Sequence, residues 1–320
     1  MKYIRNYRKS FQLVIFCRQA SYSSVSVVRN QNEIFDNELA RQTSDIGRIE
    51  KITVNVHEKI KNETFSMNKH LSTPFNVAQH ISKWMVEKSA LALVDNSKVW
   101  DMHKPLEDDC SLRFLSFTDE DPHHVNKAFW RTCSFVLGAV IQNAFNDSIK
   151  VLLHSFPSPQ ITSGSFVHDA MVSLDDWKPS SDELRCLSAD MLKLSLKELP
   201  IERLTVKEQL AQEIFAENKF KLQQIPDISK NSGGKVTLYR VGSHIDISKG
   251  PMISNTSLIG RCSVTSVHSI ETDNGKLYRF QGIALPKGLL LNHFAYKILE
   301  DRSTKLNTKD YGSTKKQAMV

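Results

Sequence analysis

Apolar residues recur at two different spacings along this chain, and the order of those spacings restricts the fold more than any other feature. Ile52, Val54 and Val56 alternate with polar residues, a period of two that predicts a half-buried strand. Over residues 129–145 the apolar positions recur every three or four residues, which predicts an amphipathic helix. After residues 232–234 (Ser-Gly-Gly) the chain returns to strand spacing. Strands, then helices, then strands predict an α+β chain.

The first group of strands forms a unit that we place at residues 51–118. Its patterns predict, in chain order, a strand, a helix, a buried strand, a turn and two further strands, at residues 52–56, 73–85, 90–94, 95–97, 99–102 and 111–117. A small mixed sheet with one helix is the expected result. The order of these elements predicts a compact β-grasp domain.

A second domain is expected at residues 119–301. Capping boxes, in which Ser or Thr is followed three residues later by Glu, predict that two helices start after Ser180 and Thr205. Asn274-Gly275 lies between two apolar segments and predicts a β-hairpin. Residues 302–320 form a polar tail rich in Lys, Thr and Ser, which we expect to be disordered in the isolated protein.

The first thirty residues have the composition of a targeting segment. No acidic residue precedes Glu33, and serines are frequent, which predicts a mitochondrial presequence at residues 1–30. A secretory signal around residues 11–17 and a basic arm retained on the mature protein are the alternatives. Residues 31–50 are polar with sparse apolar positions, and we expect a connecting helix there.

Charge and cysteine content narrow the function classes. Lys plus Arg number 42 against 35 Asp plus Glu, giving a net charge of +7 and an isoelectric point near 9.0, which suits an RNA partner. No uninterrupted apolar stretch approaches the ~20 residues that span a bilayer. The five cysteines are widely spaced without a C-x-x-C pair, which argues against a disulfide scaffold and a zinc knuckle.

Several segments resemble the N-terminal editing half of threonyl-tRNA synthetases, from about Ile52 to Ile298. Residues 90–117 resemble the TGS domain of that family, a β-grasp module associated with RNA-binding proteins. The editing domain is matched by further motifs: Glu198-Leu199-Pro200-Ile201-Glu202-Arg203, Asn218-Lys219-Phe220-Lys221-Leu222, Leu238-Tyr239-Arg240-x-Gly242, Asp246, Gly250-Pro251 and Arg279-Phe280-Gln281-Gly282. The resemblance implies an N-terminal TGS β-grasp domain followed by an α+β domain of the threonyl/alanyl-tRNA-synthetase editing type.

The editing site of that family is degenerate in this sequence. The family builds it from a His-x-x-x-His pair on the long helix and a Cys-x-x-x-His pair beside the Gly-Pro, residue types that can hold a metal or a water against an ester. The corresponding positions here are Arg131, Phe135, Ser248 and Met252. None of them is a strong zinc ligand, so we expect no catalytic site, no metal and no cofactor. No segment resembles the aminoacylation domain that follows in the synthetases, so we expect no amino-acid activation.

The presequence, TGS domain and degenerate editing domain together resemble a family of mitochondrial large-subunit ribosomal proteins. That resemblance implies a non-enzymatic, structural role in the mitochondrial ribosome, with large-subunit rRNA and other mitochondrial ribosomal proteins as partners. Charge clusters suggest the RNA-binding residues Arg41, Arg48, Lys51, Lys305, Lys309, Lys315 and Lys316. A stand-alone tRNA-binding module and a trans-editing deacylase are the alternatives, although the four substitutions argue against the deacylase.

Other polar residues receive a structural interpretation. His123, His124, His168, His244 and His268 lack metal-ligand spacing, and we expect them to be scattered on surfaces. Asp246 is expected to cap its loop through backbone hydrogen bonds. The segment Ser232–Lys235 lacks the length of a phosphate-binding loop and is expected to be a flexible loop.

Overall fold

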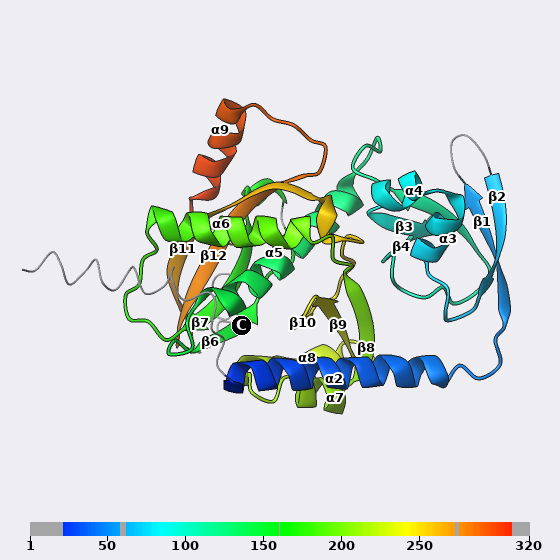
Figure 1. The fold of residues 1–320 in the computed structure, drawn as a ribbon, viewed down its shortest axis with the longest axis horizontal. Helices are drawn as coiled ribbons and strands as arrows, with labels where there is room; N and C mark the ends of the chain where they lie inside the picture. The colour runs from blue at the N-terminus through cyan, green and yellow to red at the C-terminus, as the bar shows by residue number, and fades with distance from the viewer. Residues whose placement is uncertain (1–21, 58–61, 160, 273–274, 309–320) are drawn as a thin grey trace, which may run out of the picture.

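A computed structural model describes residues 22–57, 62–159, 161–272 and 275–308 (Figure 1). Its strands form three sheets: a five-stranded sheet near the N-terminus, a three-stranded sheet, and a four-stranded sheet. Most of the expected presequence, and the candidate RNA-binding residues Lys309, Lys315 and Lys316, lie outside the described residues. The architecture is α+β, as the sequence predicts.

The five-stranded sheet has the strand order β2-β1-β5-β3-β4. Its strands are β1 (Lys51–His57), β2 (Asn62–Asn68), β3 (Leu91–Val94), β4 (Lys98–Trp100) and β5 (Cys110–Leu115). In β1 the apolar side chains are buried and the alternate ones exposed, as the period of two predicts. β1 runs antiparallel to β2 and parallel to β5. β2 is missing from the elements expected from the sequence, because its alternation is short, with only Phe65 and Met67 as apolar positions.

Two short helices, rather than the single helix expected, cover the inner face of this sheet. They are α3 (Pro74–Ile81) and α4 (Lys83–Lys88). Thr73 and Asn76 form a capping box at the start of α3. Ser82 then adopts an extended conformation, and its side chain accepts the Met85 N–H, so it ends α3 and caps α4. The expectation of one continuous helix to Met85 is therefore wrong.

The four-stranded antiparallel sheet forms the larger part of the second unit. Its strand order is β11-β12-β7-β6, with β6 (Val151–Ser155), β7 (Phe166–Val172), β11 (Ile259–Thr272) and β12 (Gly275–Pro286). The helices α5 (His123–Ala144) and α6 (Ser181–Leu196) pack on it (Figure 1). The capping box of Ser180 and Glu183 is present with both hydrogen bonds. β11 and β12 pair up to Thr272 and Gly275, which confirms the hairpin.

The three-stranded sheet lies between that unit and the N-terminal helix. It contains β8 (Glu202–Lys207), β9 (Lys235–Val241) and β10 (His244–Ile247), with α7 (Glu208–Ile214) and α8 (Lys219–Lys230) against it. Thr205 does not cap a helix. It pairs with Thr237 inside β8, and α7 begins after Lys207 without a side-chain cap. The predicted second capping box is therefore wrong, because sheet pairing uses Thr205 instead.

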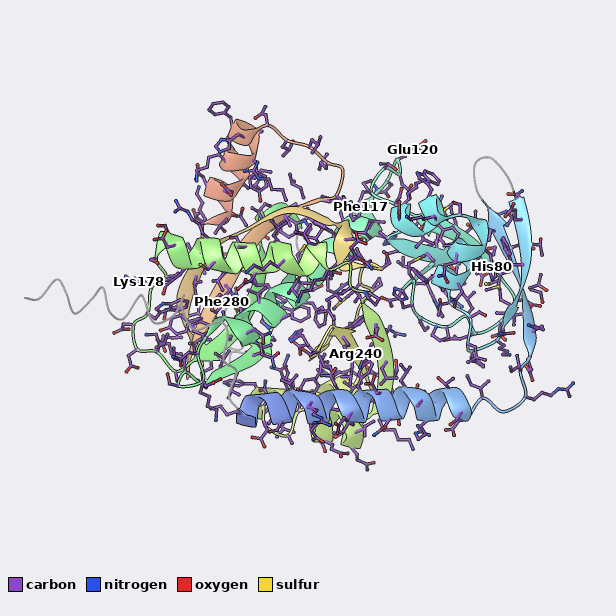
Figure 2. All side chains as sticks on the ribbon, viewed as in Figure 1. His80, Phe117, Glu120, Lys178, Arg240 and Phe280 are labelled. Carbon is purple, nitrogen blue, oxygen red and sulfur yellow. The ribbon has the colours of Figure 1, made fainter. Side chains whose placement is uncertain are left out.

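The N-terminal helix α2 (Tyr22–Ser44) packs on this small sheet. It begins within the segment assigned to the presequence and ends before residue 50. Phe35 is fully buried, and burying a side chain of this size contributes roughly 1.5 to 3 kcal/mol. The Arg240 guanidinium lies over the Phe35 ring at 4.3 Å and donates to Asp36 (2.6 Å); Figure 2 shows Arg240 between the sheet and α2. The helix is thus part of the folded body.

The C-terminal helix α9 (His293–Ser303) lies over β11 and β12. The segment 304–308 after this helix packs against the body. Asn307 is buried, its side chain donates to the Ser165 carbonyl (3.0 Å), and its carbonyl accepts from the Arg279 guanidinium. The expected disorder from Arg302 onward is therefore wrong for residues 302–308. Composition alone does not reveal that this segment has hydrogen-bond partners in the folded body, such as Ser165 and Arg279.

Candidate functional site

The four positions that the sequence motifs assign to an editing site lie on α5 and on the loop after β10. Arg131 and Phe135 are one turn apart on α5, and Ser248 and Met252 lie on the loop. All four are buried. The Arg131 guanidinium donates to the Pro251 carbonyl at 2.8 Å, so helix and loop are in direct contact. Burial lowers the pKa of Arg131.

Phe135 and Met252 fill the space between these elements with apolar atoms. Their exposed fractions are 0% and 1%. The Phe135 ring centroid lies 5.0 Å from that of His244, and the Ser248 hydroxyl accepts the Gly250 N–H at 3.3 Å. A buried phenyl ring and thioether offer no general base and no strong ligand for zinc. These four residues have the contacts of a packed core.

A buried carboxylate, Asp101, joins the five-stranded sheet to this loop. It accepts hydrogen bonds from the Tyr239 hydroxyl (3.0 Å) and from the Met252 N–H (2.8 Å), and the Arg203 guanidinium lies 3.4 Å away as an ion pair. Burial raises the pKa of Asp101, and Arg203 opposes that shift. A Cβ atom on Gly250 would lie 1.9 Å from the Tyr239 hydroxyl. Only glycine at position 250 therefore lets the loop lie this close to the Tyr239 hydroxyl.

A second buried polar cluster lies beneath α5. Lys221 of α8 forms an ion pair with Asp246 of β10, and both side chains are almost completely buried. Burial acts to raise the pKa of Asp246, but Lys221, His168 and His244 together outweigh burial, and the net shift of this pKa is downward. Asp246 also accepts the Ile247 N–H at 2.7 Å, as the sequence suggests. The sequence did not identify Lys221 as its partner.

Two histidines complete this cluster. His168 Nε2 lies 3.9 Å from Asp246 Oδ2, and His168 Nδ1 is 2.9 Å from the Ser134 carbonyl. His244 Nδ1 is 2.7 Å from Gln142 Oε1, and burial lowers the pKa of His244 to about 3. The expectation that these two histidines are on the surface is therefore wrong. His123, His124 and His268 do not join them. Within the described ranges, no set of three or more His, Cys, Asp or Glu side chains could hold a metal ion.

The candidate RNA-binding residues of the described chain are exposed but differ in their partners. Arg41 pairs with Glu38 (2.7 Å) and Asp45 (2.6 Å) on its own helix, which partly neutralises it. Arg48 is exposed between α2 and β1, and Lys51 donates to Asn68 Oδ1 at 2.6 Å. The side chain of Lys305 is exposed, while its carbonyl accepts from Gln281. Arg48 and Lys51 are three positions apart in the chain, whereas Arg41 and Lys305 lie farther away in the sequence.

Beside Lys51, the outer face of the five-stranded sheet is polar, a feature that the sequence reasoning missed. We define the open sheet face by the outward positions of β1, β2 and β5: Lys51, Thr53, Asn55, His57, Asn62, Thr64, Ser66, Asn68, Ser111 and Arg113. None of these ten positions is acidic. Two carboxylates border the face: Asp109 accepts the Thr53 N–H at 2.7 Å, and Asp95 accepts the Ser111 N–H at 3.0 Å. The polar half of the alternation in β1 was the signal that could have indicated this face.

Comparison with known proteins shows which class of protein this chain resembles. Residues 62–116 match the TGS domain family. The chain is 28% identical over 222 residues to a probable cytoplasmic threonine–tRNA ligase 1 of Dictyostelium discoideum, and 31% identical over 225 residues to the human cytoplasmic threonine–tRNA ligase 2. These matches cover 68% and 69% of this chain but only 29% and 26% of the ligases. The fold is that of a protein related to part of a threonyl-tRNA synthetase.

A more similar relative identifies the family. The chain is 48% identical over 297 residues to the large ribosomal subunit protein mL39 of Drosophila melanogaster, covering 92% of this chain and 89% of the relative. The chain belongs to the mL39 family. In the described part of the chain, no helix is long and apolar enough to cross a membrane.

Proposed function

We propose that this protein is a structural constituent of the mitochondrial large ribosomal subunit, where it contacts rRNA and neighbouring ribosomal proteins. The observation that carries the proposal is the 48% identity to mL39 along nearly the whole length of both chains. The ligases match only a part of their own length and at lower identity. A free-standing tRNA-binding or trans-editing module is accordingly not favoured.

The interior of the second unit supports a non-enzymatic role. Ester hydrolysis needs a water or metal held beside a general base in a space that the substrate can enter. Phe135 and Met252 occupy that space, and Arg131 is committed to the Pro251 carbonyl. His244, whose pKa is lowered to about 3, is too weak a base for this chemistry near neutral pH.

Charge complementarity supports contact with rRNA at the open sheet face. The face offers cations at Lys51 and Arg113, with hydroxyl, amide and imidazole groups between them and no carboxylate among its ten positions. Such groups can bind phosphates and 2′-hydroxyls, which supply most protein contacts to double-stranded RNA. Arg48 extends this surface, and the candidate residues Arg41, Lys305, Lys309, Lys315 and Lys316 would add contacts elsewhere.

We propose the following division of the chain. Residues 1–30 direct import into the mitochondrial matrix, and residues 31–50 connect this presequence to the TGS domain. Residues 51–118 form the TGS domain, residues 119–301 form the editing-like domain, and residues 302–320 form the polar tail. Because α2 begins at Tyr22 and packs on the second unit, any processing of the presequence that preserves this helix would occur before that residue.

Co-sedimentation with purified mitochondrial large subunits tests the proposal. The full-length protein should be recovered with the subunit at physiological salt. It should remain there after a high-salt wash, because protein contacts and many phosphate contacts act together. Recovery in the soluble fraction at physiological salt would refute the structural role. Binding to free tRNA in the same experiment would then favour the tRNA-binding module.

A further inference from the structure

The segment at the start of α9 exposes more apolar surface than any other described part of the molecule. Leu290, Phe294 and Ile298 are 91%, 82% and 68% exposed, and the neighbouring Leu289 and Leu291 are partly exposed. We call these five residues the α9 apolar patch. α9 projects from the body beyond α6 at the edge of the molecule (Figure 1). Contiguous exposed apolar surface of this kind marks an interaction site.

The patch is held on a rigid support. On the opposite side of α9, Tyr296 is fully buried, its hydroxyl is 3.0 Å from the Ser263 hydroxyl, and the Arg261 guanidinium lies over its ring at 3.6 Å. Asn292 caps the helix by accepting the Ala295 N–H at 2.8 Å. A capped and anchored helix loses little conformational entropy when its outer face is covered. The patch is therefore preorganised for binding.

The size of the patch argues against a second copy of this chain as its occupant. A fully exposed phenylalanine offers about 200 Å² and an aliphatic side chain somewhat less, so the five side chains expose on the order of 600 Å². A stable standard interface needs about 800 Å² from each partner, and obligate homodimers bury roughly 2,000 to 5,000 Å² in total. The patch suits one contact among several in a larger assembly.

The charges around the patch indicate the chemistry of the partner. Between residues 287 and 305 the chain has four cations (Lys287, Lys297, Arg302, Lys305) and two carboxylates (Glu300, Asp301), a net charge of 4 − 2 = +2. One cation, Lys297, already pairs with Asp301 at 3.0 Å. Phe294 and Ile298 gain nothing from phosphates, whereas an apolar protein surface removes them from water. An amphipathic helix with acidic flanks satisfies both requirements.

A groove beside the patch adds depth to this surface. It encloses about 290 Å³ between α6, β11 and α9, and its lining includes Leu184, Val264 and Lys297. Lys297 and Glu300 lie on the flank of α9 that faces the groove, next to the outward row of Phe294 and Ile298. A helix lying along α9 can therefore place one side chain in the groove while it covers the apolar row.

We propose that the α9 apolar patch docks an acidic amphipathic helix of a neighbouring protein in the large subunit. This inference rests on the proposed ribosomal function. The test replaces Phe294 with photoreactive p-benzoylphenylalanine, assembles the full chain into large subunits, irradiates them and maps the cross-link. A parallel protein carries the same group at Trp84, which is also exposed but lies on α4. We expect a cross-link from position 294 to an acidic helix of one ribosomal protein, distinct from any cross-link at position 84.

Cross-links to rRNA or to a second copy, or no cross-link from assembled protein, would overturn the inference while the ribosomal function stands. Failure of the unsubstituted protein to assemble would instead refute the proposed function. A second measurement uses L290S/F294S/I298S, with L192S/L196S on α6 as the matched control for loss of exposed leucines. The triple variant should dissociate from washed subunits about tenfold faster or more, and the control should not. Equal dissociation of both variants would also refute the docking role.

Discussion

The substitution Lys221→Met isolates the buried ion pair that lies beneath α5. Methionine keeps an unbranched apolar side chain, one atom shorter than that of lysine, and removes the ammonium that faces Asp246. The two side chains are 3% and 1% exposed, so water cannot replace the lost partner. Removing one member of a buried pair leaves an uncompensated charge and costs about 3 to 5 kcal/mol. We expect a loss of that size in the free energy of unfolding at pH 7.

Urea unfolding of the full-length protein, followed by circular dichroism, measures this loss. Lys219→Met is the matched control, because Lys219 is on the same helix but exposed, and its cost should stay within about 0.5 kcal/mol. The double variant K221M/D246N should recover most of the loss, since the amide introduced by Asp246→Asn carries no charge and can still accept the Ile247 N–H. A cost below about 1 kcal/mol for Lys221→Met would refute the argument that the pair is tightly buried.

The pH dependence of stability provides an independent check. In the native protein the pKa of Asp246 is lowered. The ionised carboxylate therefore contributes to the free energy of unfolding above the unfolded pKa of about 3.9, and this contribution is lost as pH falls through the lower, folded pKa. Without Lys221, burial raises the pKa of Asp246, and the penalty of the variant should grow as pH rises above about 4. The native protein and the variant should therefore converge in stability in acid. A constant difference from pH 4 to pH 7 would contradict this mechanism.

Four further predictions follow from other parts of the molecule. Gly250→Ala should cost about 2 to 4 kcal/mol in urea unfolding, because its Cβ meets the Tyr239 hydroxyl at a positive φ, whereas Gly233→Ala has open space and should lose only the smaller cost of strain. Charge reversal of Arg48 and Lys51 to Glu should reduce the magnitude of the negative slope of log affinity against log salt for single-stranded RNA by about 1.4 or more, while Arg185→Glu on α6 leaves it unchanged. Seryl-tRNA of threonine specificity should decay at its uncatalysed rate in the presence of the protein; turnover abolished by His244→Ala would contradict the filled site. A reporter fused to residues 1–30 should enter mitochondria, and its retention in the cytosol or secretion would contradict the presequence.

Local sequence patterns predicted many of the helices and strands but not the contacts that these make with distant parts of the chain. The period of two in β1 and the capping box at Ser180 depend on neighbours within a few residues, so the sequence was sufficient for both. Thr205 satisfied the same capping pattern and still became part of a strand, because pairing with Thr237 across the sheet competes with the helix start. The continuity of the helix to Met85 failed for a similar reason, since Ser82 can serve as an end and as a cap.

At the candidate site, too, the sequence indicated local features but not the contacts between distant residues. Motifs were sufficient to assign Arg131, Phe135, Ser248 and Met252 to an expected site. Whether side chains fill the space between α5 and the loop depends on residues that are distant in the sequence. Lys221 and Asp246 are 25 positions apart, and His168 approaches them from another strand. No spacing rule connects such residues. The ordered segment around Asn307 was missed because its partners, Ser165 and Arg279, are more than twenty residues away.

The residues at the four positions that the motifs assign to an editing site form part of the core. An open site beside α5 would need a hydrated space between the helix and the loop, with polar groups held for a substrate. Phe135 and Met252 instead bury apolar side chains there, each contributing roughly 1.5 to 3 kcal/mol. Met252 also donates its N–H to Asp101, so this loop connects the two units. A catalytic site trades stability for access, whereas a ribosomal scaffold needs fixed relative positions of its binding faces. The four buried residues therefore favour rigidity, and Phe135→His should weaken this core without creating hydrolytic activity.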